Sequence, residues 1–510
     1  MYQIDKKDFG GSYLAAVVLA ALILIMLCQA FIFKWQPVDD AFISFRYAKN
    51  LASGHGLVFN TDEKVEGYTN FLWTVILAGF GWLGFDIPII SVILGATLSA
   101  VGLYLTLLLA GLVAIEHNWP KKFAWLAPII LTFYPGYSYW AFSGMEGPLL
   151  LCLVTGFLVV VVKGTDSWPA ITLTAVLGVL TAMTRWETVL LWPIAVLAIL
   201  FRPGKFSVRN LIKPILLSAM LVAGFGIYFL GRFSYYGELL PNTFYAKVGS
   251  PMLSRIFRGI IYTGELGVNW LLLITFVMWI WRRPKRCTTV LAACLIVPCV
   301  YVVWTGGDHF PWLRFYLPIL PIPAIMAADL AARLSGWLKK LNMTIPAASL
   351  IIVIIAAIGY RLDFDAASEH TGWVSGWKKI GIWAKETFPS NYTIALAPIG
   401  AVGYYSEHKI VDMLGLTDYE IAHFGQFYPT EPPGHQRSDI NYILERKPDI
   451  MLGQARVFDY VPSEQETIDK SHRRPLKELF NLPRFHDLYQ FKVAQSGEDY
   501  FPYWQLDKSE

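Results

Sequence analysis

Long apolar runs alternate with short polar turns over the first 360 residues of the chain. The first run, at 13–33, approaches the roughly 20 residues that span a bilayer, and no clean cleavage site follows it. We therefore expect an uncleaved first helix. Together with that helix, the later runs predict about 11 transmembrane helices, at about 88–116, 122–135, 147–163, 168–183, 187–201, 211–231, 260–281, 288–304, 314–335 and 345–361.

A further apolar run at 71–85 is too short to span with ease and is better suited to lie in the membrane interface. The positive charges support this interpretation, because basic loops mark the cytoplasmic side. The turns at 135–147 and 305–313 contain no Lys or Arg. The alternation of sides is unbroken only if 71–85 does not cross. The basic loops hold Lys6-Lys7, Lys121-Lys122, Lys163, Arg202, Lys205, Arg209, residues 282–286 and Lys339-Lys340.

The last 149 residues have a different pattern, which predicts a separate domain on the outer surface. Apolar runs shrink to strand length at 392–397, 409–413 and 448–452, and turn formers are frequent between them. Short strands that alternate with helical segments indicate a small α/β domain. We expect a polytopic α-helical membrane domain at 1–362 and a C-terminal extracytoplasmic α/β domain at 363–510.

Composition agrees with a membrane protein. Only 16% of the residues are charged, against about 25% in soluble domains, and 55% are hydrophobic. The net charge of +4 is small and implies no nucleic-acid partner. All five cysteines lie in or beside apolar runs, so we expect buried small side chains rather than disulfides or a zinc site.

The first outward loop carries the adjacent acids Asp39 and Asp40. Apolar residues recur at helical spacing after Asp39, so the pair is expected at a helix N-terminus, where Asp39 can serve as the N-cap. A cap needs only one acid. The second can face a cavity as a general base or a metal ligand, and we favour Asp40 for that role.

Other ionisable residues are expected on the same outer side. Each also has a plain structural interpretation: a solvated loop histidine for His55, a surface lysine for Lys247 and a local ion pair for Arg185 with Glu187. One arginine can bind two phosphate oxygens at once, and intramembrane charges usually face a cavity or one another. Guanidinium groups and carboxylates at one membrane face therefore suit a lipid-phosphate substrate. These candidates are His55, Glu66, Glu146, Arg185, Glu187, Lys247, Asp308, His309 and Arg314.

At these residues the chain resembles the GT-C class of polytopic glycosyltransferases, which use polyprenyl-phosphate sugars. Their features are an acidic motif in the first outward loop and juxtamembrane helices, matched here by Asp39-Asp40 and 71–85. The fuller pattern resembles the arabinofuranosyltransferase-like branch, from about 36 to 455. Its segments are 39–43, 46–48, 54–58, 65–71, 143–146, 184–187, 240–243, 306–308, 400–405, 412–418 and 447–449.

The resemblance implies an inverting transfer of a sugar, arabinofuranose for this branch, from a polyprenyl-phosphate donor to a glycan or protein acceptor. The reaction would take place at the outer face of a bacterial cytoplasmic membrane. Asp39 or Asp40 would be the base, and Arg46, Arg185, Lys247 or Arg314 would hold the leaving phosphate. The other substrate-binding residues implied are His55, Glu66, Tyr68, Glu146, Glu187, Asp308 and His309. Some relatives bind a divalent metal, and Asp39, Asp40 and Glu146 offer oxygen ligands for Mg²⁺, Mn²⁺ or Ca²⁺.

Two other functions stay open at the level of sequence. A flippase or transporter of lipid-linked sugars is one, although such proteins often contain inverted repeats, and no repeat is visible here. A non-catalytic membrane scaffold is the other, although it has no need of acids and arginines at matching depth.

Overall fold

The computed structural model describes residues 12–164, 167–201, 211–247, 249–270, 285–340, 344–432 and 434–508. The chain divides into two compact units, each built from separate stretches of sequence. The first unit comprises Met1–Gln36, Ser91–Gly231 and Met252–Ala367. The second unit comprises Pro37–Ile90, Arg232–Pro251 and Ser368–Glu510. The predicted basic residues Lys6, Lys7, Arg202, Lys205 and Arg209, and the predicted span beyond residue 270, lie outside the described residues.

The first unit is helical, and some of its helices are long and apolar enough to cross a membrane. Among the described residues there are four: α1 (Ser12–Phe33), α4 (Ile87–His117), α10 (Ile212–Tyr236) and α14 (Arg286–Thr305). A fifth results if α6 (Pro135–Phe142) and α7 (Gly147–Lys163), bent by 117°, form one span. The multi-pass character is thus supported, while the number of eleven stays a prediction.

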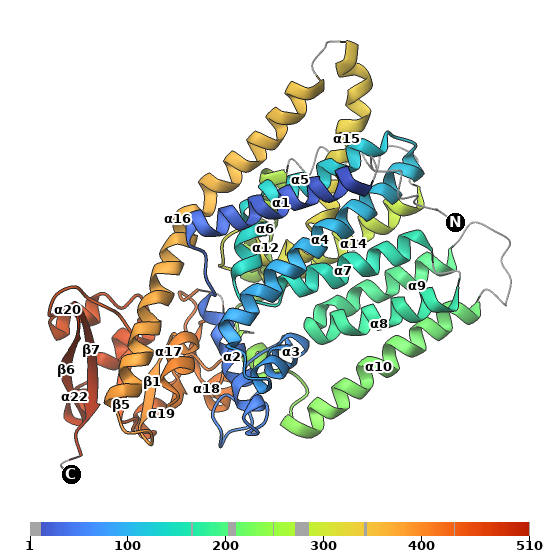
Figure 1. Cartoon of the computed structure of the whole chain (residues 1–510). Coiled ribbons are helices and arrows are strands. Elements are labelled where there is room, and N and C mark those ends of the chain that lie inside the picture. The colour runs from blue at the N-terminus through green and yellow to red at the C-terminus, as the bar shows by residue number, and fades with distance from the viewer. Residues whose placement is uncertain are drawn as a thin grey trace. The chain divides into compact units, whose positions relative to one another are not determined.

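The structure describes further helices in this unit. They are η2 (Lys121–Trp125), α5 (Leu126–Phe133), α8 (Trp168–Thr184), η3 (Trp186–Leu191), α9 (Trp192–Leu200), α12 (Met252–Trp270), η5 (Arg314–Ile319), α15 (Pro321–Lys340) and α16 (Thr344–Thr387), the last of which continues into the second unit. Figure 1 shows α7 and α8 side by side. Glycine permits close helix packing: a Cβ on Gly95 of α4 would lie 2.3 Å from the Ala141 carbonyl oxygen.

The second unit begins with two helices that follow α1 in the chain. Helix α2 (Asp39–Ala52) packs against α3 (Phe71–Trp82) and against α17 (Ile399–Ser406). The 12 residues of α3 give a length of about 18 Å, which is less than the roughly 30 Å of a hydrocarbon core. A helix therefore forms in the short run at 71–85, and it is too short to span.

The C-terminal residues form a five-stranded sheet with the strand order β2-β1-β5-β7-β6. Strands β1 (Thr393–Leu396), β2 (Lys409–Asp412) and β5 (Ile450–Gly453) run parallel and confirm the three predicted strands. Strands β6 (Tyr489–Ser496) and β7 (Asp499–Leu506) form an antiparallel hairpin at the other edge. The apolar runs did not predict this hairpin, because polar residues interrupt both of its strands.

Short elements connect these strands. They are α18 (Tyr419–Phe424), β3 (Gln426–Phe427), β4 (Arg437–Ser438), α19 (Ile440–Glu445), α20 (Glu464–Asp469), α21 (Arg474–Phe480) and α22 (Pro483–Leu488). Helix α11 (Asn242–Lys247), from the 232–251 segment, packs against α18.

The sheet places its two faces in two different cores. Ile394 and Leu396 of β1 join a cluster that contains Ile43 and Tyr47 of α2, whereas Ala395 faces the opposite cluster with Trp504. Alternate residues of a strand point to opposite faces, which explains this division. The segment after α1 is therefore packed directly into the core of the C-terminal sheet.

Candidate active site

Helix α2 starts at the acidic pair, but Asp39 does not cap it. Val38 is the N-cap in an extended conformation, no side chain caps the helix, and Asp39 and Asp40 occupy its first turn. The predicted N-cap role of Asp39 is therefore wrong. The carboxyl group turns away because it has a stronger set of partners elsewhere in the second unit.

Those partners are main-chain amides at the N-terminus of α17. The Ala401 N–H donates to Oδ1 of Asp39 at 2.7 Å and the Gly400 N–H to Oδ2 at 3.3 Å. A carboxylate at a helix N-terminus satisfies amides that the helix itself leaves unpaired. Gly400 permits this approach, since a Cβ there would lie 2.0 Å from the Asp39 carbonyl oxygen. Asp39 thus caps a helix that lies about 360 residues away in sequence.

The burial of Asp39 changes its acidity. Its side chain is only 9% exposed, and burial raises its pKa from 3.8 to about 7, an effect larger than the opposing one of the two amide hydrogen bonds. Asp40, the next residue, is partly exposed. The two acids therefore have different environments despite their adjacency.

Arg46, two turns further along α2, is occupied by main-chain oxygens. It donates from Nε to Phe59, from Nη1 to Gly403 and from Nη2 to His408, at 2.6–2.8 Å. It is 7% exposed and also bonds Oδ1 of Asn60. These bonds tie α2 to the loop after it, to α17 and to the turn between α17 and β2, so a structural clamp is the role that the geometry favours.

Glu66 and Tyr68 lie in the core of the second unit. Glu66 is 4% exposed and pairs with Arg232, whose Nε and Nη2 both lie 2.6 Å from Oε2. The Tyr68 hydroxyl lies 3.3 Å from that of Tyr236. Both contacts join the segment between α2 and α3 to the end of α10.

His55 and Lys247 are exposed at separate places in the second unit. His55 lies in the loop after α2 between Gly54 and Gly56, both at positive φ, and lines a pocket. Lys247 is the last residue of α11, and its side chain runs beside Gly434. The structure does not bring these two predicted residues together.

The other six predicted residues lie in the first unit and form two ion-pair groups around one aromatic ring. Arg185 lies 3.4 Å from Glu146 and 2.8 Å from Glu187. Arg314 lies 2.6 Å from Asp308, which is also 3.5 Å from His309. Each guanidinium carbon is 5.5 Å from the centre of the Phe315 ring. Residues from three separate segments thus converge at one ring.

The described residues do not fit the metal site that the acidic motif suggested. No group of three His, Cys, Asp or Glu side chains gathers among them to hold a cation. Both carboxyl oxygens of Asp39 already accept amide hydrogen bonds. We therefore derive no step through a metal.

Several residues of the motifs, which had no role predicted from sequence, form hydrogen bonds that connect turns within the second unit. Asn242 donates to the carbonyls of Gly415, Leu416 and Asp418. Asp412 accepts from the amides of Leu414 and Thr417. The Pro-Asn and Gly-Leu-Thr-Asp patterns are turn-forming signals, but no local pattern indicates that two such turns meet.

Comparisons with known proteins agree with this fold. The model of a domain of unknown function, DUF8728, matches residues 363–500. A terminal β-(1→2)-arabinofuranosyltransferase of Mycobacterium tuberculosis is 26% identical over 279 residues, covering 51% of this chain and 43% of the relative. A Corynebacterium glutamicum protein of the same name is 26% identical over 342 residues, covering 57% and 47%. This chain thus spans less than half the length of both relatives.

Among solved structures, ArnT from Cupriavidus metallidurans bound to undecaprenyl phosphate has a TM-score of 0.62 at 12% identity, covering 97% of this chain and 98% of that one. The fold is therefore that of GT-C membrane glycosyltransferases. The resemblance to the arabinofuranosyltransferase-like branch is confirmed by the two named relatives.

Proposed function

We propose that the chain is an inverting glycosyltransferase that moves arabinofuranose from a polyprenyl-phosphate donor to a hydroxyl of a glycan or protein acceptor. The names of the two relatives support the sugar, and the fold shared with an undecaprenyl-phosphate-bound protein supports a lipid-linked donor. In this proposal residues 1–362 form the transmembrane catalytic domain and residues 363–510 the extracytoplasmic one. The basic loops support an active site on the outer face of the cytoplasmic membrane.

The observation that carries the proposal is that the two adjacent acids have different partners and different exposure. Asp39 is committed to the α17 amides, so we assign the base to Asp40 in the first turn of α2. Asp40 takes the proton of the acceptor hydroxyl as its oxygen attacks the anomeric carbon. The bond from that carbon to the phosphate oxygen breaks, and the lipid phosphate leaves with the electron pair. One displacement inverts the configuration.

The leaving phosphate needs positive charge, and we assign this role to Arg185 and Arg314, with Lys247 as a third candidate. The two arginines lie at the same ring in the first unit and can bind phosphate oxygens in pairs. Their acidic partners Glu146, Glu187 and Asp308 hold them in place. Arg46 receives no such role because its donors are taken by carbonyls.

A transfer assay with purified full-length chain in detergent tests the proposal. The substrates are a radiolabelled polyprenyl-phosphate arabinofuranose and an arabinofuranose oligosaccharide. We expect transfer by the wild type and a loss of at least about 100-fold in Asp40→Asn, the range for removal of a general base. Asp487→Asn, an exposed carboxyl on α22, is the matched control and should keep its activity.

Full activity in a well-folded Asp40→Asn variant would show that Asp40 is not the base. Absence of any transfer by the wild type, with movement of the lipid-linked sugar across liposome membranes, would instead identify a flippase. Mass analysis of surface glycans from a deletion strain tests the sugar, because a missing pentose and a missing hexose differ in mass.

A further inference from the structure

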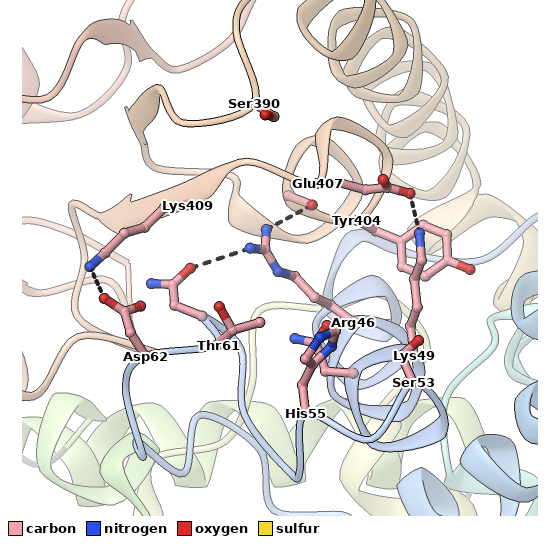
Figure 2. Close-up of a pocket in the computed structure, with 13 residues that line it drawn as sticks. Arg46, Lys49, Ser53, His55, Thr61, Asp62, Ser390, Tyr404, Glu407 and Lys409 are labelled. Atoms are coloured by element: carbon pink, nitrogen blue, oxygen red, sulfur yellow. Dashed lines mark hydrogen bonds and ion pairs between the residues drawn. The ribbon is translucent and has the colours of Figure 1, made fainter.

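A pocket of about 550 Å³ lies within the second unit, apart from the acidic pair (Figure 2). The C-terminal half of α2 and the loop after it form one wall, and the turn between α17 and β2 contributes the other. Neither Asp39 nor Asp40 lines it. Its volume falls in the range of sites that bind small molecules, roughly 300–1,000 Å³.

The charged groups of the pocket are already matched with one another. Lys49 pairs with Glu407, and Lys409 pairs with Asp62, as the dashed lines in Figure 2 show. Arg46, the fifth charged residue, donates to main-chain carbonyls. The two lysines and the two carboxylates balance in charge and Arg46 bonds carbonyls, so the lining has no excess of positive charge for an anion and is better suited to a neutral ligand.

The uncharged side chains of the lining include three aliphatic hydroxyls. Ser53, Thr61 and Ser390 are exposed, and within the described part of the chain their side chains make no hydrogen bond. Tyr404 adds a phenol ring and His55 an imidazole, each able to donate or accept. Ser390 comes from the segment before β1, whereas Thr61 and His55 come from the loop after α2 (Figure 2). Donors and acceptors from separate segments therefore surround one pocket.

We propose that this pocket binds the saccharide chain of the acceptor at a distance from the reacting hydroxyl. A neutral, polyhydroxylated chain both donates and accepts hydrogen bonds, and its C–H faces pack on aromatic rings, which fits this lining. Lys49 lies nine residues after Asp40 on α2, about 14 Å along the helix, so the ligand extends over several sugar residues. The inference rests on the proposed function, because it makes this saccharide the acceptor.

Binding of a linear arabinofuranose hexasaccharide to the full-length chain in detergent, measured by calorimetry, tests the pocket. Ser390→Trp and Thr61→Trp fill the pocket from two exposed positions, so both variants should fold. Ser496→Trp, in the exposed β6–β7 turn, is the matched control. We expect at least tenfold weaker binding in the two pocket variants and wild-type affinity in the control. Equal affinity in all four proteins, or displacement of the hexasaccharide by inorganic phosphate, would overturn the proposal.

Transfer kinetics separate this inference from the proposed function. The ratio of kcat/KM for the hexasaccharide to that for a disaccharide should fall about tenfold in Ser390→Trp, because only the longer acceptor reaches the pocket. An unchanged ratio with active transfer refutes the acceptor pocket and leaves the transferase in place. A third outcome is that the wild type binds the hexasaccharide but transfers no sugar, while Ser390→Trp no longer binds it. That result would support the saccharide site and refute the transferase.

Discussion

The buried carboxyl group of Asp39 should make the stability of the chain depend on pH, and Asp39→Asn should remove that dependence. The carboxyl lies against the N-terminus of α17 with a pKa of about 7, against 3.8 for an ordinary Asp. Asparagine keeps an oxygen that can accept from Ala401 but cannot ionise. Asp39→Ala provides the contrast, because it removes the acceptor as well as the charge.

The magnitude follows from the difference between the two pKa values. Between about pH 4 and pH 7 the unfolded chain has lost the Asp39 proton while the folded chain keeps it, so the free energy of unfolding falls as pH rises. Three units of difference at 1.36 kcal/mol each correspond to ~4 kcal/mol, fully lost above about pH 7. Asp39→Ala should be about 1–3 kcal/mol less stable than Asp39→Asn at every pH, because it also leaves the buried amides unpaired.

Thermal unfolding in detergent, followed by the fluorescence of the 19 tryptophans, measures the effect at one heating rate. The Tm of Asp39→Asn relative to wild type should increase steadily from about pH 5 to about pH 8. Asp62→Asn is the control: its hydrogen bond with Lys409 lowers the pKa of Asp62, so its Tm difference should be constant over this range. Parallel curves for wild type and Asp39→Asn would refute the reasoning.

Three further predictions concern the contacts that hold the second unit together. Arg46→Met should lower the free energy of unfolding by about 3 kcal/mol, because several buried carbonyls lose their donor; an unchanged Tm would contradict the clamp. Arg232→Met should cost about 3–5 kcal/mol by leaving the Glu66 carboxyl buried and unpaired, and adding Glu66→Gln should recover much of it. A double-mutant cycle on Tm measures this coupling, and simple additivity would exclude it. Gly400→Ala should cost about 3 kcal/mol, because its Cβ would overlap Asp39, whereas Gly372→Ala, with open space around it, should not destabilise; equal Tm values for the two variants would contradict the close approach.

The sequence predicted which charged residues gather at the site better than it predicted the role of each one. Arg185 and Arg314 were expected at one outer face, and both lie at the Phe315 ring. Arg46 and Glu66 looked equally suited to substrate, yet each is buried among protein partners. Charge and spacing do not reveal burial, which depends on segments that arrive from elsewhere in the chain.

The periodicity of the chain by itself determined its class, the position of many helices and three strands of the C-terminal sheet, because hydrophobic runs and turn formers act over a few residues. The start of α2 at the acidic pair was also readable, since helix spacing begins there. Only the tertiary structure decided that Asp39 caps α17, that the segment after α1 packs into the C-terminal sheet, and that a pocket opens between them. Each of these depends on contacts between residues more than 300 positions apart, and no local pattern encodes which distant amide, core or loop a side chain will meet.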